Sequence, residues 1–371
     1  MKYCIVGPAY PLRGGIAHHT SLLTYHLSRE HHVHAVTFKR LYPSILFPGR
    51  SQIDPSAQPC DFDQTRIIDS LNPLTWMEAA RTIVRLSPER VIIQWWQPLL
   101  GLCLGFIAGT VKKNSRVTFI CHNVLPHESM PMTRWLAVRT LRNADSFIVH
   151  SSRDKENLAQ LLGNLNPAVI RKTIHPQYEL FPITGISKHE ARGRLGVDGS
   201  LVLFFGLVRK YKGLMDLLEA MSMVTTPNLT CLVVGEFYDK RDKYEARARE
   251  LGLTGRIRII DSYIPNEDVE LYFSAADVVV LPYRSATQSG IIQIAFRFAR
   301  PVIATTVGGL PESIDNNRTG LLVPPQNPVA LAHAIDRYFS ESLESKFCAE
   351  IRRQGSRFSW DRVIETIESL N

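Results

Sequence analysis

The sequence predicts an α/β protein built from two Rossmann-like domains, and three observations support this. A strand, a turn and a helix start follow one another twice, first at residues 3–17 and again at residues 201–214. Short apolar runs alternate with helical patterns along the chain, which is typical of parallel sheets with crossover helices. At 371 residues the chain is too long for one ordinary core and suits two domains. We expect the two domains to face each other across a ligand-binding cleft.

The first domain is expected to span residues 1–180. Its strands are predicted from apolar runs at residues 4–7, 33–38, 91–94, 117–121 and 146–150. The polar, proline-containing stretch at 42–63 predicts a long irregular loop. Residues 91–111 carry no charge, but Pro98 interrupts them, so a buried strand, a turn and a core helix are favoured over a membrane-spanning helix. Residues 175–182, with two prolines and no periodicity, predict a linker.

The second domain, residues 181–355, repeats the scheme. Its strands are predicted at residues 201–205, 231–235, 257–261, 278–281, 302–304 and 321–323, each bounded by Gly, Pro or Asp. A last helical pattern at 359–370 comes after this sheet is complete. We expect the segment 356–371 to pack back on the first domain.

The net charge of +8 lies entirely in the first half of the chain. Residues 1–182 hold 20 Lys and Arg against 12 Asp and Glu, whereas the remaining residues hold 23 of each. These basic residues form either a solvated face without a partner or a surface that attracts anionic lipid or a phosphorylated acceptor. We favour the second interpretation, with a membrane surface as the partner. No stripe of Lys and Arg alternates with aromatic residues, so nucleic acid is not expected as a partner.

The six cysteines are scattered without any Cys-x-x-Cys pair, as in a reduced cytoplasmic protein. The first apolar stretch ends at Gly7, which is too early for a signal peptide. We therefore expect a cytoplasmic protein. Because its first half carries an excess of basic residues, we also consider peripheral attachment to the inner face of the plasma membrane.

A basic turn follows the predicted strand that ends before Gly206. Arg209, Lys210 and Lys212 supply three cations within four residues, and Gly213 precedes a helical pattern. Backbone N–H groups at a helix start attract anions, so this turn suits a diphosphate. A solvent-facing basic turn is the alternative.

A second candidate anion site follows the predicted strand at 278–281. Thr287, Ser289 and Gly290 place hydroxyl and N–H groups at the start of an apolar helix. Gln293 lies three residues further on. Its side chain either caps this helix or binds a ribose hydroxyl.

The first domain offers two further candidates. His122 lies just past a predicted buried strand, where open parallel sheets bind ligands, and a purely structural role is the alternative. Gly14 and Gly15 permit close approach to a phosphate or sugar beside His18 and His19. The dinucleotide-binding Gly-x-Gly-x-x-Gly spacing is missing, which disfavours a nicotinamide cofactor. No zinc-ligand spacing is found either, so no metal is expected.

The order of these motifs resembles the retaining glycosyltransferases of GT-B fold, family 4, the glycosyl transferases group 1. The resemblance spans essentially the whole chain. Its motifs are Gly14-Gly15, His122, Phe205-Gly206, Lys212-Gly213, Ala276-Asp277-Val278, Pro301 to Thr305, Gly308 to Glu312 and Gly320 to Pro325. It implies the GT-B fold: two Rossmann-like domains facing across a cleft, with a C-terminal helix that crosses back to the N-terminal domain.

The resemblance also implies substrates and residue roles. The C-terminal domain would bind a nucleotide-diphosphate sugar, and the N-terminal domain a glycan or lipid-linked acceptor, without any cofactor. The nucleotide-sugar-binding residues would be Gly14, Gly15, Gly206, Arg209, Lys212, Ser285, Thr287, Gln288, Ser289, Gly290 and Gln293. The acceptor-binding residues would be His18, His19 and Asn123, and the catalytic residues would be His122, Arg209 and Lys212.

The implied activity is metal-independent transfer of a hexose-type sugar to a hydroxyl with retained configuration, in cell-surface polysaccharide or glycoconjugate synthesis. The chain departs from the family at its paired glutamates, because Ser285 and Gln293 occupy those positions. The family's diphosphate-binding arginine is also displaced, with Leu207 in its place and Arg209 two residues later. Two alternatives therefore stay open: a GT-B-fold nucleotide-sugar epimerase and a non-catalytic partner subunit.

Overall fold

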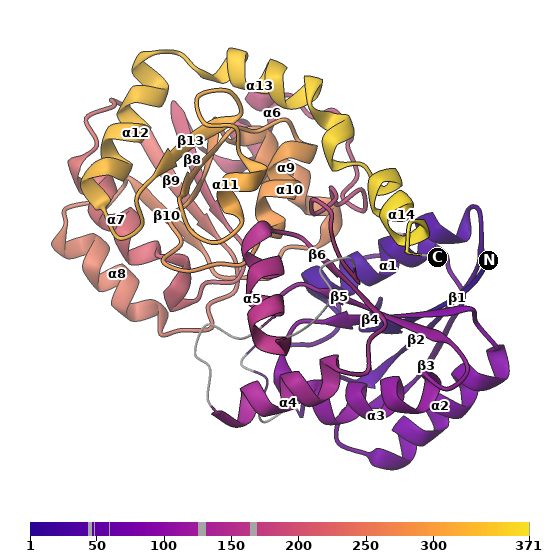
Figure 1. The fold of residues 1–371 in the computed structure, drawn as a ribbon. Coiled ribbons are helices and arrows are strands. Elements are labelled where there is room, and N and C mark those ends of the chain that lie inside the picture. Colours follow the sequence, from indigo (N-terminus) through magenta and orange to yellow (C-terminus); the bar gives the residue numbers. More distant parts are fainter. Residues whose placement is uncertain (44–46, 48, 59, 125–130, 164–168, 371) are drawn as a thin grey trace. The chain divides into compact units, whose positions relative to one another are not determined.

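The chain divides into two compact units, each built around its own parallel sheet (Figure 1). The computed structural model describes residues 1–43, 47, 49–58, 60–124, 131–163 and 169–370. Unit 1 consists of Met1–Pro176 and Ser359–Asn371, and unit 2 of Gln177–Phe358. No helix among the described residues is long and apolar enough to cross a membrane.

Unit 1 contains a seven-stranded sheet with the order β3-β2-β1-β4-β5-β6-β7, in which all neighbours are parallel. Its strands are β1 (Lys2–Gly7), β2 (His32–Arg40), β3 (Gln64–Asp69), β4 (Arg90–Trp95), β5 (Arg116–Cys121), β6 (Ser146–Val149) and β7 (Ile170–Lys172). The central strands are buried on both faces, as their continuous apolar runs require.

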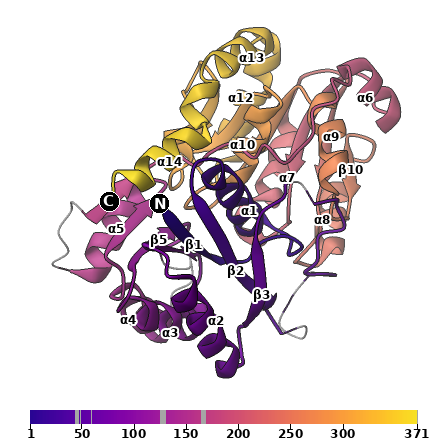
Figure 2. The ribbon, with the colours of Figure 1, turned by 90° about the vertical axis from the view of Figure 1, so that its right-hand side faces the viewer.

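Helices cover both faces of this first sheet (Figures 1 and 2). They are α1 (Gly15–Ser28), α2 (Pro73–Leu86), α3 (Gly101–Val111), α4 (Pro131–Leu141), α5 (Ser152–Leu162) and α14 (Trp360–Glu368). The helices α2, α3 and α4 share one core with the sheet. The last helix, α14, contacts α1 within unit 1, so the chain returns to its first unit after completing the second.

Unit 2 contains a six-stranded parallel sheet with the order β10-β9-β8-β11-β12-β13, which is the Rossmann order counted from its own first strand. Its strands are β8 (Ser200–Phe205), β9 (Leu229–Val234), β10 (Ile257–Ile260), β11 (Val278–Leu281), β12 (Val302–Thr305) and β13 (Gly320–Val323).

The helices of unit 2 are α6 (Lys188–Leu195), α7 (Leu214–Met223), α8 (Arg241–Glu250), α9 (Val269–Ala275), α10 (Gly290–Arg297), α11 (Leu310–Ser313), α12 (Pro328–Ser340) and α13 (Glu344–Arg353). One core joins α7, α8, α12 and α13 to the sheet through alternate strand residues such as Phe204. Phe205 points to the other face, where its ring lies 4.9 Å from that of Phe273 in α9.

The α/β fold class predicted from the sequence is confirmed, and every predicted strand of unit 2 is present within a few residues. Residues 91–111 form a buried strand, a single 3-10 turn and the core helix α3, as expected. The strands β3 and β7 were not predicted from the sequence, and both lie at the edges of the first sheet. Within the expected loop at 42–63, residues 44–46, 48 and 59 lie outside the description.

Candidate functional site

The order of the second sheet reverses between β8 and β11, which lie side by side. Parallel sheets bind ligands outside the carboxyl ends of their strands at such a reversal. The basic turn at 209–213 follows β8, and the segment 282–290 follows β11. Both candidate anion sites predicted from the sequence therefore lie at one edge of one sheet.

Two glycines let the turns approach each other closely. Gly213 has φ +69°, and a Cβ there would lie 1.9 Å from the carbonyl oxygen of Pro282. Gly206 has φ +100°, and a Cβ there would lie 3.3 Å from Nζ of Lys212 and 3.0 Å from Cδ1 of Ile291. Positive φ and these short distances exclude larger side chains at both positions. The backbone N–H of Arg284 donates to the carbonyl oxygen of Tyr211 at 2.7 Å and links the two turns directly.

The side chain of Lys212 is buried beneath this junction. It is 9% exposed, and its Nζ lies 5.6 Å from the ring centroid of Tyr283. Among the described residues, no carboxylate lies within salt-bridge distance of it. Burial, together with repulsion from Arg209, lowers the pKa of Lys212 to about 7. Such a group gains strongly from an anionic ligand, which would restore its charge.

Arg284 and Arg209, the two arginines near Lys212 in these turns, differ in whether a carboxylate neutralises their charge. Arg284 is neutralised by Asp216, which accepts from Nε at 2.8 Å and from Nη2 at 2.5 Å. Arg209 is exposed and stacks on Tyr238 with its guanidinium carbon 4.8 Å from the ring centroid, and no described carboxylate pairs with it. Arg209 and Lys212 thus lie at the strand ends without a carboxylate partner among the described residues, and their binding of a diphosphate stays a prediction.

The helix α10 begins beside these cations. Ser289 is its N-cap residue but makes no capping hydrogen bond with its side chain. Gln293 is 1% exposed, and its Oε1 has no hydrogen-bond partner among the described residues. This oxygen therefore does not cap the helix, and it remains available to accept a ligand hydroxyl. Ser285, Thr287 and Gln288 line the half-buried loop that leads to the helix.

The remaining candidates belong to unit 1. Gly14 is the N-cap of α1 with φ +110°, and Gly15 is the first helical residue. His18 Nε2 lies 3.1 Å from Oδ2 of the buried Asp54, so this side chain is already held by an acidic partner. Asn123 is half-buried directly after His122.

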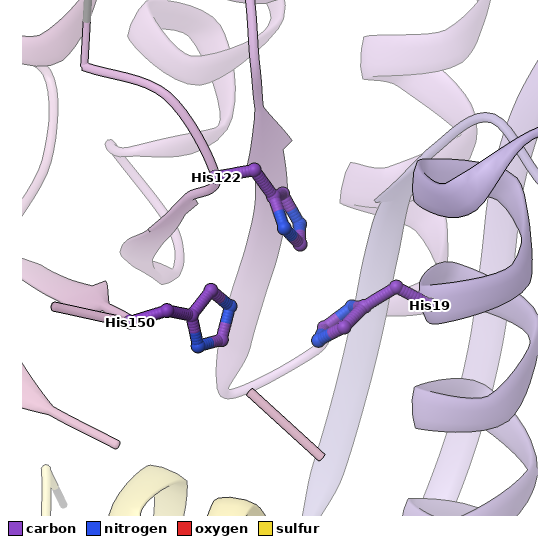
Figure 3. Close-up of side chains that lie close together, drawn as sticks. All are labelled: His19, His122 and His150. Carbon is purple, nitrogen blue, oxygen red and sulfur yellow. The ribbon is translucent and has the colours of Figure 1, made fainter. Parts of the chain in front are cut away.

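His122 lies within a group of buried histidines. It follows β5, as predicted, and its Nε2 lies 2.6 Å from Oε1 of Gln94. His19, from α1, and His150, directly after β6, converge on it (Figure 3). His175 packs against His150 at a ring-centroid distance of 5.1 Å. Burial, and then the neighbouring imidazoles, hold the pKa of His19 and His122 well below the usual range.

The same causes lower the pKa of His150 to about 3, and burial lowers that of His175 to about 4. The sequence analysis proposed no role for either residue, although His150 ends a predicted strand. Its place at the carboxyl end of that strand was the available signal. His19 was expected to bind the acceptor, but it is fully buried among these rings, so it has no surface for a direct contact.

Comparison with known proteins finds a similar family and similar single proteins. Residues 199–341 match the family described as glycosyl transferases group 1. The D-inositol 3-phosphate glycosyltransferase of Corynebacterium urealyticum is 28% identical over 242 residues, which cover 62% of this chain and 56% of that protein. The putative teichuronic acid biosynthesis glycosyltransferase TuaC of Bacillus subtilis is 28% identical over 64% of this chain and 59% of its own length. The chain thus spans little more than half of these relatives.

Solved structures match over the whole chain. Sucrose-phosphate synthase from Thermosynechococcus elongatus gives a TM-score of 0.77 at 21% identity, covering 100% of this chain and 98% of its own. Anabaena HepE in complex with UDP gives 0.77 at 18% identity with full coverage of both chains. These likenesses confirm the GT-B fold. The sequence matches confirm the predicted resemblance to the glycosyl transferases group 1, which the family match supports over residues 199–341.

The unpaired charge of Lys212 should be visible in the stability of the protein. Because the pKa is about 7 in the folded chain and 10.5 in the unfolded chain, the unfolded chain binds more protons between these values. The free energy of unfolding should therefore rise with pH across that window, and the destabilisation should be complete below pH 7. Lys212→Met should raise the free energy of unfolding by about 2 kcal/mol near neutral pH and flatten this rise.

Urea titrations followed by circular dichroism at neutral and alkaline pH measure both effects. Lys240→Met, which removes an exposed lysine of the same unit, should change neither. A loss of stability at neutral pH in Lys212→Met would show that the folded protein itself stabilises this ammonium.

Proposed function

We propose that this protein transfers a sugar from a nucleotide-diphosphate sugar to a hydroxyl of a glycan or lipid-linked acceptor. The observation that carries the proposal is the buried ammonium of Lys212, which no carboxylate of the described residues pairs with and which lies at the strand ends where an α/β sheet binds ligands. The relatives named as glycosyltransferases and the UDP complex of a structural neighbour support the same donor class.

In this proposal unit 2 binds the donor. The diphosphate would contact Lys212 and Arg209, and the N–H groups at the start of α10 would complete its surroundings. Gln293 Oε1 would accept a hydrogen bond from a ribose hydroxyl, which would relieve an acceptor that is buried without a partner. Ser285, Thr287 and Gln288 would contact the nucleotide along the same loop.

Negative charge grows on the diphosphate as the glycosidic bond breaks. Arg209 and Lys212 already hold positive charge at that point and need no reorganisation, so they would stabilise the departing group more than the bound donor. We propose that these two cations take the place of a metal ion on the diphosphate and that no cofactor takes part. The resemblance further suggests that the acceptor attacks from the face that the diphosphate leaves, which retains the configuration.

On the acceptor side we propose His18 and Asn123, both in unit 1. The resemblance implies that Gly14 and Gly15 contact the nucleotide sugar. His18 is the side chain best placed to hydrogen-bond an acceptor hydroxyl, because Asp54 already orients its ring through Nε2. His122 is proposed from the resemblance to lie near the reacting sugar.

Donor binding should take up a proton above neutral pH. With a pKa of about 7, Lys212 is largely neutral in the free protein at alkaline pH, and a bound diphosphate would draw the proton back. We expect UDP or GDP to bind with uptake of about one proton near pH 8, measured by calorimetry in buffers of different ionisation enthalpy. Lys212→Met should abolish this uptake and weaken binding by about 10- to 150-fold, the cost of one charge-assisted hydrogen bond.

Lys240→Met serves as the matched control and should bind as the wild type does. If UDP-, GDP-, ADP- and dTDP-sugars all fail to shift the melting temperature, the chain is a non-catalytic partner. Binding that is unaffected by Lys212→Met would place the diphosphate elsewhere and end this proposal.

The product should keep the anomeric configuration of the donor. Proton NMR of the transfer product made from an α-linked nucleotide sugar should show an α linkage. A β linkage would contradict retention, while leaving transfer itself intact. Release of a free sugar isomer in the absence of acceptor would instead identify an epimerase.

We further propose that unit 1 docks on an anionic membrane surface at the inner face of the plasma membrane. The adjacent helices α3 and α4 expose Phe106, Met132 and Trp135 to 43%, 60% and 56%. Exposed arginines lie among them, and the guanidinium carbon of Arg139 lies 5.4 Å from the centroid of the Trp135 ring. Apolar side chains interleaved with basic ones suit the headgroup region of an anionic bilayer.

Trp135→Ser should therefore lower binding to vesicles that contain phosphatidylglycerol by about tenfold, because one large apolar side chain no longer enters the interface. Flotation of the protein with vesicles measures this. Tyr25→Ser, which removes an exposed aromatic residue of α1, should have no effect. Equal binding to pure phosphatidylcholine vesicles would contradict attraction by charge.

A further inference from the structure

The strand order of the first sheet also reverses, between β1 and β4, which lie side by side. Parallel sheets bind ligands outside the carboxyl ends of their strands at such a reversal, so unit 1 has a ligand-binding edge of its own. The strand β4 ends at Trp95, whose side chain is fully buried in the core. Trp96 and Gln97 follow directly and are half-buried. These two side chains, to which the sequence analysis gave no role, therefore lie at the ligand-binding edge of unit 1.

The end of β4 lies beside the proposed acceptor-binding residue Asn123. The N–H of His122 donates to the carbonyl oxygen of Trp95 at 2.8 Å, so the segments that follow β4 and β5 start next to each other. After β1, on the other side of the reversal, a Cβ at Gly14 would meet no described atom within 4 Å. This edge of the sheet therefore offers both polar neighbours and space for a ligand.

Tyr42 holds the side chains of Trp96 and Gln97 in place. Its phenol oxygen accepts from Nε1 of Trp96 at 3.1 Å and from Nε2 of Gln97 at 2.7 Å. Tyr42, which follows β2, is itself fixed by the amide of Gln52, which accepts from its N–H at 3.0 Å and donates to its carbonyl oxygen at 2.9 Å. Side chains that are already ordered lose little entropy when a ligand binds, so this group is organised as a binding surface.

The chemistry of this group matches a neutral sugar ring. The indole of Trp96 is a rigid apolar surface, supported from the core by Phe38, whose ring lies 6.4 Å away at 80°. The amide of Gln97 uses Nε2 on Tyr42, and its Oε1 accepts no hydrogen bond from the described residues, so it can accept from a ligand hydroxyl. A pyranose ring presents C–H groups on its faces and hydroxyls around its rim, which suit these two side chains. A lipid chain would bury the amide oxygen without a partner.

We propose that Trp96 and Gln97 bind a sugar ring of the acceptor, so that the acceptor is a glycan recognised through a neutral sugar. This inference rests on the proposed function, because it names the acceptor of the sugar transfer. The sugar ring stacks on the indole of Trp96, and one of its hydroxyls donates to Oε1 of Gln97. Tyr42 is a positioning residue that acts through both. None of these side chains carries a charge, so a phosphate or carboxylate of the acceptor would have to bind elsewhere.

Saturation-transfer-difference NMR of the full chain tests this proposal. The probes are the methyl glycosides of glucose, galactose, mannose and N-acetylglucosamine, together with octyl glucoside below its micelle concentration. The wild type should transfer saturation to the ring protons of at least one of these sugars. Trp96→Leu should weaken binding of that sugar by about tenfold, and Trp96→Phe should restore part of it, because a smaller aromatic surface remains. Gln97→Leu should weaken binding by about fivefold, the effect of one neutral hydrogen bond.

Trp76→Leu is the matched control. Trp76 is also half-buried against the core of unit 1 and donates its indole N–H, to the carbonyl oxygen of Asp69 at 2.7 Å, but it belongs to α2. This variant should bind the sugar as the wild type does. Tyr42→Phe removes the phenol oxygen that orients Trp96 and Gln97, and it should weaken sugar binding while leaving UDP binding unchanged, which a general loss of structure would not do.

The proposal is overturned if no glycoside of the panel receives saturation from the wild type, or if Trp96→Leu and Gln97→Leu both bind as the wild type does. Saturation of the alkyl chain of octyl glucoside without its sugar ring would show an apolar-chain site instead. Failure of the proposed function is distinguishable, because UDP and GDP would then not bind, or Lys212→Met would not weaken them, whichever glycoside binds. Trp96→Leu should keep the nucleotide affinity of the wild type, and Lys212→Met should keep its sugar affinity.

Discussion

Unit 2 is constrained most by a buried positive charge, that of Lys212, for which the described part of the chain supplies no counterion. An ammonium as little exposed as that of Lys212 loses its hydration, and a pKa reduced from 10.5 to about 7 corresponds to roughly 5 kcal/mol. The surrounding backbone nonetheless fixes this arrangement. Gly206 and Gly213 adopt positive φ, and the turn after β8 lies so close to the carbonyl group of Pro282 that Gly213 leaves no room for a Cβ atom. The buried ammonium and the closely packed turns both lie at the strand ends where the sheet order reverses, which is where an anionic ligand could compensate for the charge.

Unit 2 was predictable from the sequence nearly strand by strand, because central strands such as β8, β9 and β11 are buried on both faces and form nearly continuous apolar runs. The two strands that were missed in unit 1 are edge strands. In β3 only one of six residues is fully buried, and β7 is three residues long, so neither leaves an apolar run to detect. The order of elements left the final helix free to return to unit 1, because no strand of the second sheet remained for it to connect, and the resemblance to the GT-B fold implied that return.

The candidate sites also differ in how far they could be predicted from the sequence. The basic turn and the start of α10 are local in sequence, and the spacing of Gly213 and Gly290 from the preceding strands was enough to locate them. Their pairing across the sheet edge, and the distinction between Lys212 and the neutralised Arg284, required the structure. The histidine group is not local at all. More than a hundred residues separate His19 from His122, so no local spacing pattern can reveal the group. Only His122 and His150 share a recognisable position, directly after the strands β5 and β6.

The return of α14 also has a consequence for how such chains can be recombined. Topologically, unit 2 is an insertion within unit 1, because the chain leaves unit 1 after Pro176 and re-enters it at Ser359. The two ends of the insertion are adjacent, since the N–H of Gln177 donates to the carbonyl oxygen of Phe358 at 2.9 Å. A segment with neighbouring ends can be replaced by another of the same kind without stretching the chain that receives it. Evolution or an engineer can therefore exchange this whole sheet through one pair of adjoining peptide junctions.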